Sequence, residues 1–199
     1  MTSASSKVSQ LVNEMDYTAL AAWVGIVIAI VVLIVQNRTA KKLTCLQLFL
    51  QLAERYDSAE MNFRRARLAQ TLLTDRKTLK IDDTILVFFE NVSLMLQRGL
   101  LDSDLTWNTF GIDVSSYWCA LKHYIDDMRT SFKDNSLYRE FEWLAHAMRA
   151  HTLDHGDSES RIGIKDDDAA ITLFLELETR RSLERASDAT QKQLLASSE

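Results

Sequence analysis

An uncharged, apolar run near the N-terminus constrains this chain more than any other feature of its sequence. No charged residue occurs between Thr18 and Val35, a length at the lower end of the roughly 17–25 residues that span the hydrocarbon of a bilayer. Tyr17 and Trp23 stand near its outer end, where aromatic rings favour the membrane interface. A buried core helix is the alternative, but so long a β-branched run without a polar position is unusual in a small domain. The sequence therefore predicts a transmembrane helix over residues 18–36.

The residues before and after the run favour an uncleaved anchor over a signal peptide. The preceding segment carries Glu14 and Asp16 as well as Lys7, which is unlike the positive n-region of a signal peptide. No small-x-small cleavage site follows, since the chain continues with Gln36 and Asn37. We therefore expect the helix to remain in the protein.

Basic residues lie on the C-terminal side of the predicted span. Arg38, Lys41 and Lys42 follow it, and no acidic residue occurs before Glu54. Lys and Arg close to a span mark its cytoplasmic side, so we expect an inner-membrane protein with residues 1–17 outside and the rest in the cytoplasm. The same three residues are candidate contacts for lipid headgroups. A second group of basic residues either contacts lipid headgroups as well or forms an ordinary solvated face. Its members are Arg64, Arg65, Arg67, Arg76, Lys77 and Lys80.

Small residues recur along one face of the predicted span. Ala21, Gly25 and Ala29 are spaced by four residues, and small residues at this spacing let two membrane helices approach closely. They are the candidate dimer face, although Ala and Gly are also common in membrane helices in general.

The remainder of the chain favours an all-α fold. The sequence contains 5 Gly and no Pro, which suits long helices and disfavours a turn-rich sheet. Residues 37–149 are predicted to form a bundle of four to five helices. The stretch 84–99 is apolar around almost its whole circumference, so it belongs in the centre, and Gly99 suits its C-terminal cap. Gly111 is expected to bend the chain after a short helix that begins at Asp102.

Apolar residues at helical spacing identify the expected buried faces. Asp57 and Glu60 are spaced as a capping box that starts a new helix. In this helix Phe63, Ala66 and Leu73 are expected to point inward, with the three arginines at 64, 65 and 67 outward. The last core helix repeats apolar residues at spacings of four, three and four. The tryptophans of the bundle are expected to pack with these stripes: Trp107, Trp118 and Trp143.

The C-terminal quarter has a different character. Residues 150–168 are rich in Asp, Ser and His and predict an acidic, flexible linker. Residues 169–199 predict an amphipathic helix with a frayed tail. Its apolar face, which begins at Ile171, can dock on the bundle, pair with a second copy or engage another partner.

Charge and cysteine content exclude several classes of protein. Residues 150–199 contain 6 Lys and Arg against 11 Asp and Glu, which equals the net charge of −5 of the whole chain. No concentrated basic face remains, so we expect no binding of nucleic acid. Cys45 and Cys119 are far apart and form no CxxC pair, so neither a disulfide framework nor a thiolate metal site is expected.

No catalytic motif occurs, and we expect neither an enzyme nor a cofactor. The sequence contains no G-x-S-x-G, no glycine-rich phosphate loop and no H-E-x-x-H. His151 and His155 are spaced to share a metal on a helix, with Asp154 beside them and His146 one turn earlier. No further ligand stands at a recognisable spacing, so no metal site is assigned.

Several short segments resemble a known family. These are FRRAR at Phe63–Arg67, VFFENV at Val87–Val92, the pairs Phe110–Gly111 and Tyr117–Trp118, and YREFEWL at Tyr138–Leu144. Over roughly Leu43–Met148 the chain resembles an uncharacterised bacterial family, domain of unknown function number 4760. The resemblance implies a bacterial, membrane-anchored helical protein and brings no catalytic residues.

These observations together predict a protein that acts by binding. We expect a membrane-anchored interaction or scaffold protein that forms a homo-oligomer or tethers another protein at the cytoplasmic face of the bilayer. The alternative is a membrane-linked effector or sensor of a bacterial stress or phage-defence system.

Overall fold

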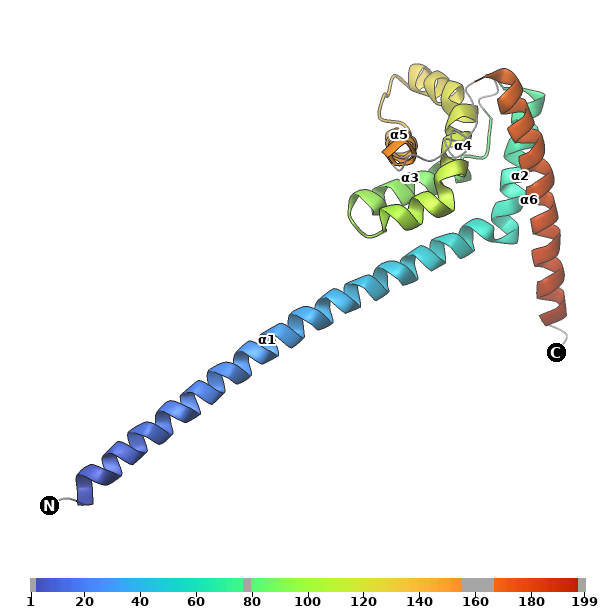
Figure 1. Ribbon diagram of the computed structural model, residues 1–199. Coiled ribbons are helices and arrows are strands. Elements are labelled where there is room, and N and C mark those ends of the chain that lie inside the picture. The colour runs from blue at the N-terminus through green and yellow to red at the C-terminus, as the bar shows by residue number, and fades with distance from the viewer. Residues whose placement is uncertain (1–2, 77–79, 155–166, 197–199) are drawn as a thin grey trace. The chain divides into compact units, whose positions relative to one another are not determined.

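Six α-helices occur in the part of the chain that the computed structural model describes (Figure 1). The structure describes residues 3–76, 80–154 and 167–196, and their side chains over 22–76, 80–154 and 167–188. No strand occurs within these ranges, which confirms the predicted all-α fold. The chain divides into two units, residues 1–45 and 46–199. The helices are α1 (Ser3–Asp57), α2 (Ala59–Thr74), α3 (Thr84–Gln97), α4 (Ser103–Phe132), α5 (Arg139–Asp154) and α6 (Asp168–Ala196).

The first unit consists of helical residues of α1 that carry the apolar run. Large apolar side chains from Trp23 to Val35 are between 46% and 67% exposed. Within the described residues, α1 is the one helix long and apolar enough to cross a membrane. The side chain of Ala21 lies outside the described residues, as do those of residues 1–20.

The core of the second unit is a cluster of aromatic rings centred on α3. Phe88 stacks on Tyr56 with ring centroids 5.1 Å apart, and it meets Phe110 of α4 edge to face at 5.8 Å. Phe89 stacks on Phe141 of α5 at 5.3 Å. All five rings are at most 4% exposed. Helix α3 therefore lies at the centre of the bundle, as the sequence predicts.

Two glycines were assigned structural roles from the sequence. Gly99 adopts a φ of 64° directly after α3, as expected for a left-handed cap. Gly111 does not bend the chain, because α4 runs unbroken from Ser103 to Phe132. A Cβ on Gly111 would lie 3.0 Å from Cδ1 of Trp107, so this glycine makes room for an indole ring one turn earlier.

The predicted inward faces are correct for α5 but partly wrong elsewhere. Phe141, Leu144 and Met148 are buried in α5, whereas Trp143 is 42% exposed. Phe132, at the end of α4, is 66% exposed. The helix α5 continues to Asp154, inside the predicted linker, and residues 155–166 lie outside the described residues.

Candidate functional site

Helices α2 and α6 lie side by side and antiparallel in the second unit (Figure 1). Three pairs of arginine and carboxylate groups define their alignment. At one end Arg76 Nη1 lies 2.7 Å from Asp168 Oδ1. At the other end Arg185 Nη1 lies 3.3 Å from Oδ1 of Asp57, the last residue of α1. The sequence left three possibilities for the apolar face of the C-terminal helix: docking on the bundle, pairing with a second copy or engaging another partner. In the structure α6 docks on the bundle.

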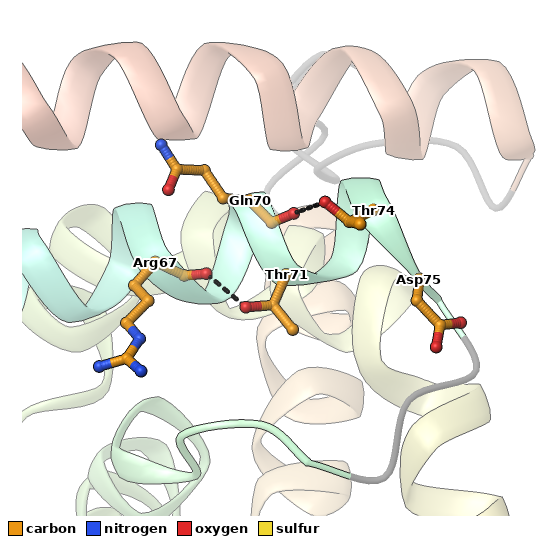
Figure 2. Close-up of a pocket in the computed structure, with 5 residues that line it drawn as sticks. All are labelled: Arg67, Gln70, Thr71, Thr74 and Asp75. Carbon is orange, nitrogen blue, oxygen red and sulfur yellow. Dashed lines mark hydrogen bonds between the residues drawn. The ribbon is translucent and has the colours of Figure 1, made fainter.

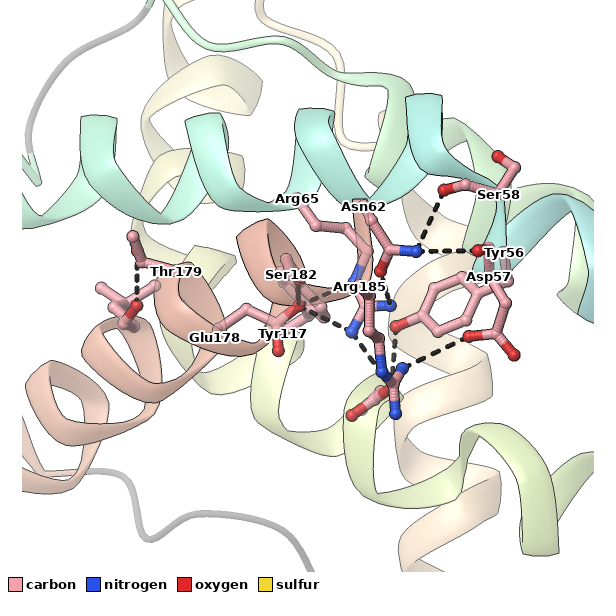
Figure 3. A network of polar contacts seen from close by, with 12 residues as sticks. Tyr56, Asp57, Ser58, Asn62, Arg65, Tyr117, Glu178, Thr179, Ser182 and Arg185 are labelled. Atoms are coloured by element: carbon pink, nitrogen blue, oxygen red, sulfur yellow. Dashed lines mark hydrogen bonds and ion pairs between the residues drawn. The ribbon is translucent and has the colours of Figure 1, made fainter. Parts of the chain in front are cut away.

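The third pair joins the middle of α2 to the middle of α6 and is buried (Figure 3). The side chain of Arg65 is 0% exposed and that of Glu178 is 1% exposed. Nε and Nη2 of Arg65 lie 2.7 Å and 2.6 Å from the same oxygen, Oε1 of Glu178. Tyr117 and Ser182 each donate a hydroxyl hydrogen bond of 2.9 Å to this oxygen. Three hydrogen bonds, from Nε of Arg65 and the two hydroxyls, therefore converge on one carboxylate oxygen, and Nη2 of Arg65 lies within ion-pair distance of it.

A second carboxylate lies behind the guanidinium group. Oδ2 of Asp113 accepts a hydrogen bond of 2.8 Å from the hydroxyl of Tyr56 and lies 3.6 Å from Nη2 of Arg65. The guanidinium carbon stands 4.2 Å from the centre of the Tyr56 ring, a cation–π contact. Asn62 donates to the carbonyl oxygens of residues 57 and 58, which fixes the start of α2. We call this set the Arg65 network: Tyr56, Asn62, Arg65, Asp113, Tyr117, Glu178 and Ser182.

Burial sets the charge states in the Arg65 network. Burial raises the pKa of Tyr117 well above its usual value, and the nearby Glu178 carboxylate raises it further. Burial likewise raises the pKa of Asp113, against the attraction of Arg65. Burial alone would lower the pKa of Arg65, but the surrounding tyrosines and carboxylates raise it. Arg65 is therefore a permanently charged group inside the bundle, and it requires a carboxylate partner.

Glu178 is bound through only one of its two oxygens. Oε2 is buried and has no hydrogen-bond partner within the described residues. A buried carboxylate oxygen without a partner is unusual, because most buried polar atoms are paired. The contact is thus asymmetric: Oε1 of Glu178 accepts three hydrogen bonds, while Oε2 of Glu178 and Nη2 of Arg65 have no hydrogen-bond partner within the described residues.

The predicted faces of α2 are correct for Ala66, which is buried, and for Arg67, which is exposed, but wrong for Phe63 and Arg65. Arg65 was expected to face outward, yet it is fully buried, while Phe63 was expected inward and is 55% exposed. Arg64 is also paired within the protein, since its guanidinium lies 2.8 Å from the carboxylates of both Glu60 and Asp82. Arg76 binds Asp168 and the hydroxyl of Thr172. Arg65 is therefore excluded as a lipid contact.

The predicted histidine grouping is divided between different contacts. Nε2 of His151 lies 2.9 Å from Oδ1 of Asp104, and its ring stacks on Trp107. His146 instead meets Trp118 edge to face. His155 lies outside the described residues. In the part of the chain that the structure describes, no three His, Cys, Asp or Glu residues are grouped to hold a metal ion.

A surface pocket of about 290 Å³ lies along α2 (Figure 2). Its lining residues are Arg67, Gln70, Thr71, Thr74 and Asp75. The hydroxyls of Thr71 and Thr74 donate to carbonyl oxygens one turn earlier in the same helix. These hydroxyls therefore serve the helix itself and form no nucleophile–base arrangement.

The predicted membrane-facing residues lie in the first unit. Arg38, Lys41 and Lys42 are exposed on α1. Gly25 and Ala29 are also exposed, and a Cβ on Gly25 would meet no atom within 4 Å. A larger residue at Gly25 therefore fits a single chain without strain.

A family model described as a domain of unknown function (DUF4760) matches residues 19–148. The chain belongs to this family. No curated protein and no solved structure matches it. The DUF4760 segment includes most of the apolar run and helices α2 to α4, so it contains Tyr56, Arg65, Asp113 and Tyr117. Glu178 and the whole of α6 lie beyond it. The carboxylate that completes the Arg65 network thus comes from outside the DUF4760 segment.

Proposed function

We propose that this DUF4760 protein is a single-pass membrane protein whose helical bundle acts by binding rather than by catalysis. Its partner is a second copy of the chain or a protein held at the cytoplasmic face of the inner membrane. The observation that carries the proposal is the exposed apolar surface of α1 between Trp23 and Val35. An apolar surface of this length, followed by charged residues, is stable in a bilayer and unfavourable in water.

The basic residues after the apolar run support a cytoplasmic bundle. Arg38, Lys41 and Lys42 are exposed where α1 would leave the hydrocarbon. Near an anionic leaflet each such charge contributes about 1 kcal/mol of attraction. The proposed orientation places these charges against lipid headgroups and residues 1–17 on the outer side.

Topology can be tested with reporter fusions. A reporter placed after Glu199 that works only in the cytoplasm is expected to be active, because the excess of Lys and Arg follows the span. The matched fusion uses a reporter that works only outside the cytoplasm, and it is expected to be silent. The reverse pattern would contradict the orientation.

Self-association of the anchor is the second part of the proposal. Lipid provides no hydrophobic drive for two helices to pair, so close packing at small residues must supply the attraction. Gly25→Ile is expected to reduce association in membranes about tenfold or more, since a branched side chain separates the two backbones. Cross-linking in membranes measures the effect.

The control for this variant lies elsewhere on the same helix. Val27→Ile adds one methylene group on the side of the helix opposite Ala21, Gly25 and Ala29 and is expected to leave association unchanged. Because Gly25 has open space around it in a single chain, insertion and the fold of the bundle are expected to survive Gly25→Ile. Equal association in both variants would contradict an anchor dimer through this face.

A further inference from the structure

Helix α1 carries an exposed leucine face after the apolar run. Its members, Leu43, Leu46 and Leu50, are 57%, 45% and 57% exposed. On the side of the same helix that packs into the core, Phe49 and Leu52 are only 8% and 7% exposed. Single exposed leucines are ordinary on protein surfaces, but three at successive helical spacings form a continuous apolar stripe, which marks a surface for contact.

The leucine face continues the spacing of small and apolar residues in the apolar run. Gly25, Ala29 and Val32 are followed by two polar positions, 36 and 39, and then by the three leucines, in alternating steps of four and three residues. Alternating steps of four and three are the spacing of positions a and d in the heptads of a left-handed coiled coil. Helix α1 runs without a break from Ser3 to Asp57, so the whole series belongs to one helix.

The leucine face extends beyond the reach of the lipid headgroups. Leu46 and Leu50 follow Val35 by 11 and 15 residues, which corresponds to about 16 Å and about 22 Å along a helix. The polar layer on each side of the hydrocarbon is only about 5–8 Å thick, and an ordinary helix tilt of about 20° shortens these heights only slightly. A span that ends at Val35 therefore leaves both leucines above the bilayer, where a protein surface has to cover them.

We propose that the leucine face binds the same face of a second copy, in a parallel two-stranded coiled coil that continues the anchor dimer beyond the membrane. The inference rests on the proposed self-association in the membrane and names the part of the chain that completes it. Two copies inserted in the same direction bring each leucine to the height of its counterpart, which a parallel coiled coil requires. The second copy is therefore the partner that the anchor itself aligns with the leucine face.

The heptad spacing also determines how the two anchors cross. Helices joined through positions a and d cross at about +20° and stay together over many turns, whereas many small-residue dimers cross steeply, at about −40°. Gly25 and Leu50 are separated by about 38 Å of helix, and over this length a steep crossing would carry the two leucine faces apart. The shallow, left-handed crossing is the one that joins both ends of the series.

Disulfide formation between two full-length copies in isolated membranes tests the register. Each variant carries Cys45→Ala and Cys119→Ala and one new cysteine. Leu46→Cys and Leu50→Cys are each expected to form a covalent dimer under a mild oxidant, because facing positions of a coiled coil bring two cysteines within bridging distance. Gln51→Cys, an exposed position one residue further along α1, is expected to yield at least about tenfold less dimer, because its side chain points away from the contact.

Added charge tests how much the leucine face contributes to association. Leu46→Glu combined with Leu50→Glu is expected to reduce co-isolation of two differently tagged copies about tenfold or more, since it places like charges on facing positions. Gln47→Glu combined with Gln51→Glu adds the same charge at exposed positions beside the leucine face and is expected not to weaken association. Both leucines are exposed in a single chain, so an unchanged melting temperature in detergent is expected and checks that the leucine variant folds.

The outcomes distinguish the coiled coil from the proposed self-association. Co-isolation of the tagged copies with equal disulfide yields for Leu50→Cys and Gln51→Cys would overturn the coiled coil and leave association of the anchors in place. Absence of co-isolation for the unaltered chain would overturn both. Association that survives the paired leucine substitutions, or that falls equally with the paired glutamine substitutions, would also overturn the coiled coil, because the leucine face would then make no specific contact.

Discussion

Arg65→Met is expected to destabilise the bundle by about 3–5 kcal/mol, since it removes one partner of a buried ion pair. The variant leaves the Glu178 carboxyl group at 1% exposure, with hydroxyl donors but without its guanidinium partner. Glu178→Leu is expected to have a similar effect, because Arg65 then loses its closest counter-charge. Thermal unfolding of the full-length protein in detergent, followed by circular dichroism, measures both variants.

The double variant and a neighbouring arginine provide the controls. Arg65→Met combined with Glu178→Leu is expected to be more stable than either single variant, because no unpaired charge remains at the contact. Arg64→Met, which removes a partly exposed ion pair, is expected to change stability by less than about 1 kcal/mol. If the double variant lost as much stability as the two single variants together, the result would contradict a strongly coupled buried pair.

Phe88→Ala is the second substitution with a large expected effect. It is expected to destabilise the bundle by about 3–5 kcal/mol, because it leaves a cavity in the core. Phe88 is 2% exposed and contacts the rings of Tyr56, Phe89 and Phe110. The matched control is Phe63→Ala, since Phe63 is 55% exposed and its loss should have little effect. Equal melting temperatures for the two variants would show that α3 is not central.

Sequence patterns predict the candidate membrane helix and the buried faces of α3 and α5, whereas Phe63 and Leu73 of α2 were expected to be buried and are exposed. The uncharged run before Val35 predicts the one candidate membrane helix, and the apolar residues at 85–92 predict the central helix. The spacing of Phe141, Leu144 and Met148 predicts the inner face of α5. In α3 and α5 burial follows from apolar character alone, so local periodicity identifies the buried face.

The Arg65 network could not be predicted in this way. Within FRRAR, the usual assignment turns the phenylalanine inward and the arginines outward, and the structure has the reverse for Phe63 and Arg65. The carboxylate that makes burial of Arg65 tolerable is 113 residues away in sequence. A local pattern contains no information about such a partner. The exposed Trp143 is the converse case, since an aromatic ring at helical spacing does not by itself show which face is covered.

The docked C-terminal helix also acts as an internal counter-ion. Residues 150–199 carry 11 acidic against 6 basic side chains. Of these acidic groups, Glu178 pairs with Arg65 of α2, and Asp168 pairs with Arg76, which follows α2. If α6 leaves, Arg65 and Arg76 lose the carboxylates of Glu178 and Asp168. Arg64 keeps its carboxylate partners, so the electrostatic field beside α2 becomes more positive. The position of one helix thus determines whether this side of the bundle is attracted to an anionic surface. Salt, which screens such fields over about 8–10 Å, becomes a variable that acts on the fold and on membrane affinity at once.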